Sequence, residues 1–173
     1  MKLTLDRLNA LPPREAAERF RSCCGSFRWV ESMLLRRPFE NLEALLAAAD
    51  EAWLATGPTD WDEAFAHHPR IGERRAAAPV SEAARAWSAG EQGAAAGADA
   101  TTRAALAEAT QAYERRFGRI YLVCAAGRSA EDLLADIETR MGNDPERERG
   151  VAAEEQRKIT RLRLLALIGA GDR

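Results

Sequence analysis

The chain has 173 residues, of which 27 are acidic and 25 are basic, and its formal net charge at pH 7 is −2. This balance argues against a nucleic-acid-binding surface, which normally shows a basic patch. No apolar run is long enough to span a membrane, and the N-terminus lacks a hydrophobic signal segment, so we expect no membrane association. A chain of this length is most simply one domain, and we expect residues 1–173 to share a single hydrophobic core.

The chain contains three cysteines, and two of them, Cys23 and Cys24, are adjacent. An odd number with this spacing is not typical of a disulfide framework, which indicates a reducing compartment, and we expect the protein to be cytoplasmic. Free cysteine is among the most buried residue types, so we expect this pair to pack in the interior rather than to bind a metal.

Apolar spacing, prolines and capping residues predict that the chain is almost entirely helical. The clearest case is residues 101–117, which align Tyr113 and Phe117 on one face and are followed by Gly118 at a left-handed cap position. The predicted fold class is therefore all-α, a compact single-domain bundle of about eight helices. These helices begin after Pro12-Pro13, at Phe27, after Asn41, after a cap at Thr59 or Asp60, after Ser81, at Thr101, at Ser129 and at Pro145.

One segment does not have a helical pattern. Residues 120–125 are a short apolar run with β-branched and aromatic side chains, bounded by Gly118 and Gly127, and are expected to be extended. No second segment of similar quality is present to pair with them as a strand. Since buried backbone groups must be satisfied, two interpretations stay open. Side chains and caps of neighbouring helices satisfy these groups, or some of them face a pocket and bind a ligand rich in amide-like groups.

The only two histidines are neighbours, His67 and His68. Histidine is the side chain whose ordinary pKa allows proton exchange near neutral pH. Helical spacing places His68 on the apolar face of Trp61 and Phe65, whereas His67 lies about 100° round the helix. Pro69 ends the helix and pushes His68 out of helical geometry. We expect His68 at a helix end in a partly dry place and His67 to be more solvated; a hydrogen-bonded structural histidine is the alternative.

Further candidates lie on two later helices. Ser88, Glu91 and Gln92 are spaced i, i+3, i+4 and share one face, which is either a solvated face or part of a site. A glutamate beside an imidazole would raise the imidazole pKa and fix its tautomer. Arg163 lies at the edge of the last apolar stripe, where it either reaches out to solvent or points inward to bind a carboxylate. Together, a histidine, a glutamate, an arginine and backbone amides are typical of a site that binds a small, anionic, nitrogen-rich molecule.

Metal and phosphate sites have little support. The two histidines are adjacent rather than four residues apart, and no Cys-x-x-Cys or glycine-rich phosphate loop occurs. We expect no metal.

Several short stretches form an ordered pattern along nearly the whole chain. They are Cys23-Cys24-Gly25-Ser26, Arg37-Pro38-Phe39, His68-Pro69-Arg70-Ile71-Gly72, Ser88-x-x-Glu91-Gln92, Tyr113-x-x-x-Phe117-Gly118, Arg140-x-x-Asn143 and Lys158-Ile159-x-x-Leu162-Arg163-Leu164. Each stretch is weak alone, but the ordered set is specific. In this set the chain resembles the decarboxylases that convert 2-oxo-4-hydroxy-4-carboxy-5-ureidoimidazoline (OHCU) into (S)-allantoin, the last step of urate degradation.

The resemblance implies an all-helical enzyme that needs no cofactor or metal and that is a homodimer in several members. Carried over residue by residue, it makes His68 the catalytic imidazole, with Glu91 and Arg163 as its essential companions. It also implies that the substrate lies against Pro69, Ser88, Gln92, Tyr121, Leu122, Val123, Cys124 and Ala125.

We therefore expect a cofactor-independent carboxy-lyase that acts on an anionic ureidoimidazoline. Loss of CO2 leaves an electron pair on a ring carbon, which the adjacent C=N system accepts before protonation on one face. An imidazole can deprotonate the substrate hydroxyl or deliver the final proton. The alternative is a non-catalytic all-helical module that docks a protein partner, with a broad exposed apolar groove and no closed pocket around His68, Glu91 and Arg163.

Overall fold

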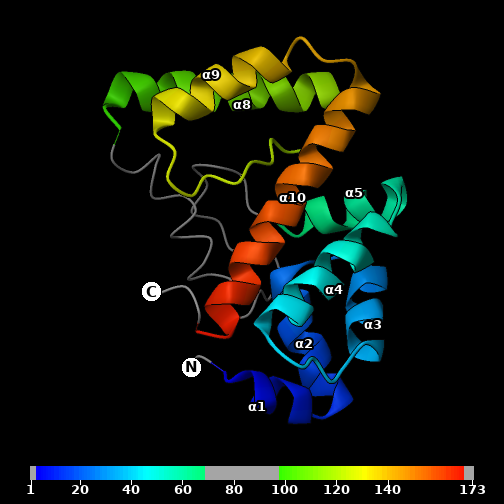
Figure 1. The fold of residues 1–173 in the computed structure, drawn as a ribbon. Coiled ribbons are helices and arrows are strands. Elements are labelled where there is room, and N and C mark those ends of the chain that lie inside the picture. Colours follow the sequence, from blue (N-terminus) through cyan, green and yellow to red (C-terminus); the bar gives the residue numbers. More distant parts are fainter. Residues whose placement is uncertain (1–2, 69–97, 170–173) are drawn as a thin grey trace. The chain divides into compact units, whose positions relative to one another are not determined.

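The computed structural model describes residues 3–68 and 98–169, and these residues form eight α-helices and no strand (Figure 1). The predicted all-α class is confirmed. None of the helices in this part of the chain is long and apolar enough to cross a membrane. The chain divides into two compact units, a first one of Met1–His67 with Gln156–Arg173 and a second one of His68–Glu155, so the expected single domain stays a prediction.

Five helices and the end of a sixth form the first unit. They are α1 (Leu5–Ala10), α2 (Pro13–Cys23), α3 (Phe27–Leu35), α4 (Leu42–Leu54), α5 (Pro58–Ala66) and the C-terminal half of α10 (Pro145–Leu167). The predicted cap of α4 is confirmed, because the Asn41 side chain accepts a hydrogen bond from the Ala44 N–H at 2.8 Å. Ser26 caps α3 in the same way.

Two features of this unit differ from the sequence prediction. Helix α1 was not predicted, because six residues are too short for a periodic pattern. Helix α5 begins at Pro58, so the predicted cap at Thr59 or Asp60 is wrong and both residues lie inside the helix. Gly57 is the N-cap and Pro58 takes the first helical position, where its missing N–H costs nothing. Asp60 lies in the first turn of the helix, and its carboxylate accepts a hydrogen bond from the N–H of the N-cap residue Gly57 at 2.9 Å.

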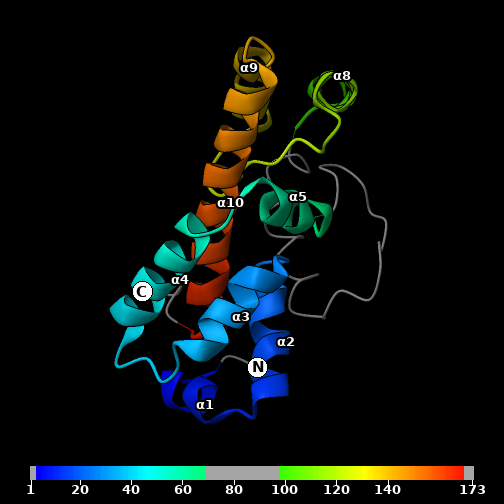
Figure 2. The ribbon, with the colours of Figure 1, turned by 90° about the vertical axis from the view of Figure 1, so that its right-hand side faces the viewer.

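Helix α3 packs against α2, α4 and α5 (Figure 2). Its Trp29 is fully buried, meets the Phe20 ring of α2 edge-on at 6.1 Å between centroids, and donates its indole N–H to the Ala49 carbonyl of α4 at 3.0 Å. Edge-to-face rings and a satisfied indole N–H are what a buried tryptophan requires. Trp29 therefore joins α2 and α4 through one side chain.

The second unit contains α8 (Ala100–Phe117), α9 (Ala130–Arg140) and the N-terminal half of α10. The predicted left-handed cap at Gly118 is confirmed, since its φ is 66°. Ser129, predicted as the first residue of the next helix, is instead the N-cap of α9, and its hydroxyl accepts a hydrogen bond from the Asp132 N–H. Helices α8 and α9 lie side by side and run in the same direction (Figures 1 and 2). Arg116, near the end of α8, accordingly donates to the carbonyl of Asn143, just beyond α9.

Because both helices run the same way, the segment between them returns along their length (Figure 1). It contains the apolar run 120–125, which has no helix or strand structure, as predicted. Its inward side chains complete one core with α8 and α9, made of Leu106, Tyr113, Phe117, Tyr121, Val123, Ala125, Ala130, Leu133 and Ile137.

The turn between α2 and α3 contacts the end of α5 at Gly25. A Cβ atom at Gly25 would lie 2.4 Å from Cγ and 2.6 Å from Cβ of His67, both close to the His67 backbone. No real Cβ tolerates such a distance, so only glycine fits unless the end of α5 moves.

We predict that Gly25→Ala lowers the free energy of unfolding by about 1–3 kcal/mol, the usual cost of overpacking a well-packed contact. Urea unfolding followed by circular dichroism measures this. Gly150→Ala, in α10, is the matched control, because nothing lies within 4 Å of its added Cβ. It should raise stability by about 0.5–1 kcal/mol through helix propensity. Equal effects of the two substitutions would contradict the contact.

Candidate active site

His68 follows the end of α5. The helix ends at Ala66, His67 is its C-cap, and His68 is half-buried one residue further on. The predicted position at a helix end, in a partly dry place, is confirmed. The predicted helix face shared with Trp61 and Phe65 is wrong for His68, because the helix ends at Ala66, in line with the expectation that a residue before proline leaves helical geometry.

His67 is exposed, as predicted, but it also has defined partners. Its Nδ1 lies 3.1 Å from the Glu63 carbonyl oxygen, and its Nε2 lies 3.3 Å from Nη2 of Arg21. A carbonyl only accepts and a guanidinium only donates. These contacts therefore select the neutral tautomer that carries its proton on Nδ1. The ring of His67 therefore links α5 to α2 through two hydrogen bonds.

Arg163 lies inward from α10 and is 6% exposed, so of the two orientations left open by the sequence it takes the buried one. Its positive charge acts on Cys23 and Cys24 of the first unit. Burial raises the pKa of both thiols to about 12, and Arg163 only partly opposes this. Both cysteines are free and fully buried, which confirms that they pack and indicates that they are unreactive thiols. The buried cation and the Cys-Cys stretch belong to one neighbourhood.

Two other arginines of α10, Arg157 and Arg161, have a different role from Arg163. Arg161 is exposed and pairs with Asp50 of α4 at 3.2 Å, as Arg157 does at 2.9 Å. These pairs tie α10 to α4 within the first unit.

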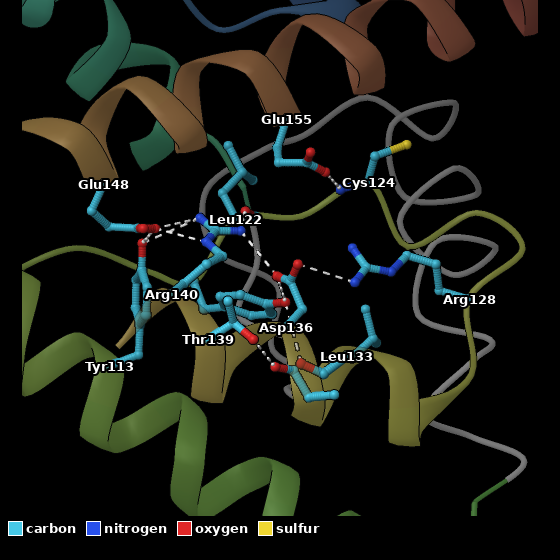
Figure 3. A network of polar contacts seen from close by, with 12 residues as sticks. Tyr113, Leu122, Cys124, Arg128, Leu133, Asp136, Thr139, Arg140, Glu148 and Glu155 are labelled. Atoms are coloured by element: carbon cyan, nitrogen blue, oxygen red, sulfur yellow. Dashed lines mark hydrogen bonds and ion pairs between the residues drawn. The ribbon is translucent and has the colours of Figure 1, made fainter. Parts of the chain in front are cut away.

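The extended segment meets two charged side chains through its backbone (Figure 3). Arg140 of α9 donates from Nη1 to the Leu122 carbonyl at 2.9 Å, and Glu155 of α10 accepts from the Cys124 N–H at 2.8 Å. For these two groups, the first of the open interpretations is correct: side chains of neighbouring helices satisfy them. Tyr121, Leu122, Val123 and Ala125 are buried, and Cys124 is half-buried.

Arg140 is itself held by a fully buried carboxylate, Glu148 of α10. Glu148 Oε1 accepts from Nε and Nη2 of Arg140 at 2.8 and 2.6 Å and from the Tyr113 hydroxyl at 2.5 Å, while Oε2 accepts from the Asn143 amide at 2.7 Å (Figure 3). Burial and Glu148 raise the pKa of Tyr113, so its phenol stays protonated and donates. Both oxygens of this buried carboxylate therefore have hydrogen-bond donors, as a buried charge requires.

A second carboxylate extends this network toward the segment. Asp136 accepts from the Tyr121 hydroxyl at 2.6 Å and pairs with Arg128 at 3.1 Å and Arg140 at 3.3 Å. Burial alone would raise the pKa of Asp136, but the hydrogen bonds from Tyr121 and Arg128 and the two positive charges hold it below its ordinary value.

The remaining predicted site residues, Pro69, Ser88, Glu91 and Gln92, lie outside the described residues. Sequence reasoning assigned no role to Arg140, Glu148 or Glu155. The available signal was the stretch Arg140-x-x-Asn143 in the family pattern, whose two members both bind Glu148. Within the described part of the chain, no group of three or more histidine, cysteine or acidic side chains could hold a metal ion.

The family model for OHCU decarboxylase matches residues 9–165. The chain belongs to the OHCU decarboxylase family. It is 35% identical over 150 residues to the uric acid degradation bifunctional protein TTL of Arabidopsis thaliana, covering 87% of this chain and 46% of that protein. It is 41% identical over 56 residues to 2-oxo-4-hydroxy-4-carboxy-5-ureidoimidazoline decarboxylase of Amia calva, covering 32% of each. The matched regions thus span less than half of either curated relative.

Solved structures agree with this family. A crystal structure of OHCU decarboxylase in the presence of (S)-allantoin superposes with a TM-score of 0.74 at 31% identity, over 88% of this chain and 98% of that one. A crystal structure of (S)-allantoin synthase matches with a TM-score of 0.70 at 19% identity, over 96% of this chain and 54% of that one, and at this identity it shows the fold alone.

We predict that Glu148→Ala lowers the free energy of unfolding by about 3–5 kcal/mol, because it leaves the Arg140 guanidinium buried without its counter-charge. Denaturant unfolding provides the measurement. Glu138→Ala, an exposed carboxylate on α9, should change stability by no more than about 0.5 kcal/mol. A Glu148 variant as stable as the control would contradict the role given to this pair.

Because the pKa of Asp136 is lowered in the folded protein, we predict that Asp136 contributes less to the free energy of unfolding at acid pH. Its pKa is lower in the folded state than the ordinary value of 3.8, so the unfolded chain binds the proton more tightly. The contribution is complete above that ordinary value and is lost as the pH falls through the folded pKa. Urea unfolding of the parent and of Asp136→Asn between pH 7 and pH 2.5 tests this. The stability difference between them should shrink at the acid end; a constant difference would contradict the assignment.

Proposed function

We propose that this protein catalyses the cofactor-independent decarboxylation of OHCU to (S)-allantoin in urate degradation. The observation that carries the proposal is the family match over residues 9–165. The superposition with an OHCU decarboxylase crystallised in the presence of (S)-allantoin, over 98% of that chain, supports it. Family membership favours this enzymatic role over the alternative of a non-catalytic protein-binding module.

We assign the proton chemistry to His68, with Glu91 and Arg163 as its companions. His68 is half-buried beyond a helix end, where an imidazole can reach a ligand and still exchange protons. Arg163 is a buried cation, and a guanidinium fork matches the two oxygens of a carboxylate. Glu91 would orient the imidazole or bind substrate N–H groups. The substrate would lie against Pro69, the Ser88–Gln92 face and the backbone of residues 121–125.

This division of labour follows from the chemistry of the step. The carbon–carbon bond to the carboxylate breaks, CO2 leaves, and the electron pair moves into the adjacent C=N system. A proton then adds to one face of the carbon. Arg163 would hold the anionic substrate, and His68 would remove the hydroxyl proton or supply the final one. We also propose that the protein is cytoplasmic, as its cysteine pattern indicates, and that it forms a homodimer, as the family resemblance implies.

We predict that His68→Asn lowers the catalysed rate on the order of 10²-fold or more, the usual loss when a positioned acid or base is removed. His67→Asn should change the rate only a few-fold, because His67 is exposed and its ring is occupied by Glu63 and Arg21. The substrate is generated from urate with the upstream enzymes, and the appearance of (S)-allantoin is followed by circular dichroism.

The parent protein must accelerate this appearance; failure to do so would exclude the proposed activity. Far-ultraviolet circular dichroism of both variants controls for folding. A dead His67→Asn and an active His68→Asn would show that the catalytic residue is misassigned.

A further inference from the structure

The two peptide groups on either side of Val123 are each held by a charged side chain. Arg140 binds the carbonyl of the Leu122–Val123 peptide at 2.9 Å, and Glu155 binds the N–H of the Val123–Cys124 peptide at 2.8 Å. The first comes from α9 and the second from α10, and both side chains are at most 9% exposed (Figure 3).

These contacts determine the direction of the Val123 backbone. Both peptide bonds are trans, since the cis bond of the described residues is Arg37–Pro38. In a trans peptide the C=O and the N–H point in opposite directions. The Val123 N–H therefore points away from the Arg140 guanidinium, and the Val123 C=O points away from the Glu155 carboxylate.

The charges also prevent either peptide from turning over. A guanidinium has only donors and an ionised carboxylate has only acceptors. A flipped peptide would place an N–H against Arg140 or a C=O against Glu155, and each contact would be repulsive. Arg140 is in turn fixed by two hydrogen bonds to Glu148, and the charge of Arg128 attracts Glu155.

We propose that Arg140 and Glu155 are positioning residues for the decarboxylation, which present the N–H and C=O of Val123 as a donor–acceptor pair to the ureido or amide groups of the substrate. This inference rests on the proposed function. A ureido or amide group offers an N–H beside a C=O, and a single extended residue can exchange both hydrogen bonds with it, as residues do in an antiparallel pair. Neither Arg140 nor Glu155 touches the substrate in this arrangement.

Glu155 is the better probe of the two. Arg140 also neutralises Glu148 and Asp136 in the core, so its loss would disturb folding. Glu155→Ala removes the acceptor of the Cys124 N–H and frees the second peptide to rotate. Glu155→Gln keeps an acceptor oxygen at the same reach. Glu138→Ala, an exposed carboxylate on α9, is the matched control.

The experiment measures kcat and KM on freshly generated OHCU, and the dissociation constant of (S)-allantoin by calorimetry. For Glu155→Ala we expect KM and the allantoin dissociation constant to rise about tenfold or more, since a hydrogen bond to a charged partner controls the geometry of the pair. Glu155→Gln should stay within about threefold of the parent, and Glu138→Ala should be unchanged. A merely structural role would reduce the amount of active enzyme without changing KM or the affinity for allantoin.

Amide hydrogen exchange supplies an independent readout, because exchange at Cys124 should accelerate in Glu155→Ala and not in Glu155→Gln. If Glu155→Ala fails to fold, Glu155→Asp, one methylene shorter, serves the same test. An active parent with unchanged KM and allantoin affinity in the folded variants would overturn the positioning role alone. A parent that does not accelerate decarboxylation would overturn the proposed function, and the positioning role with it.

Discussion

A single buried charge pair, Arg140 with Glu148, holds together the described helices of the second unit. Glu148 is fully buried and Arg140 is 4% exposed, so each has lost its water and depends on the other. The pair joins α9 to α10, the Tyr113 hydroxyl connects it to α8, and Arg140 extends it to the backbone at Leu122. Three helices and the segment between two of them thus share one set of hydrogen bonds.

This arrangement solves the problem of placing non-helical backbone in an apolar interior. Without a partner strand, the N–H and C=O groups of residues 120–125 need other partners. Long charged side chains from neighbouring helices reach two of these groups, the Leu122 carbonyl and the Cys124 N–H, and each of these side chains faces an opposite charge. Polar backbone is thereby held in place without a sheet, and its direction is determined by charge sign rather than by strand pairing.

The features that the sequence predicted are those with local signals. Asn41 and Gly118 act as predicted because a cap depends on residues three or four positions away. The start of α5 was predicted too late in the chain, because Gly57-Pro58 was interpreted only as the end of the preceding helix. The structure shows that the same pair also begins the next helix. The extended character of 120–125 was visible from composition, yet its partners were not, because Cys124 and Glu155 are 31 residues apart. Arg163 shows the same limit: periodicity placed it at the edge of a stripe, and only tertiary packing decides that it points inward.

The parallel course of α8 and α9 limits the length of the connection between them. Helix α9 has 11 residues, which rise about 16 Å. The chain must travel back over this distance before α9 can begin, and at about 3.3 Å per extended residue this takes roughly five residues. The rest of 118–129 is used in turning, at Gly118 and at Gly127, both of which have positive φ. A deletion of a few residues would leave the chain too short to reach Ser129, whereas side chains that face outward along it carry no such constraint. In this connection, length is therefore more restricted than composition.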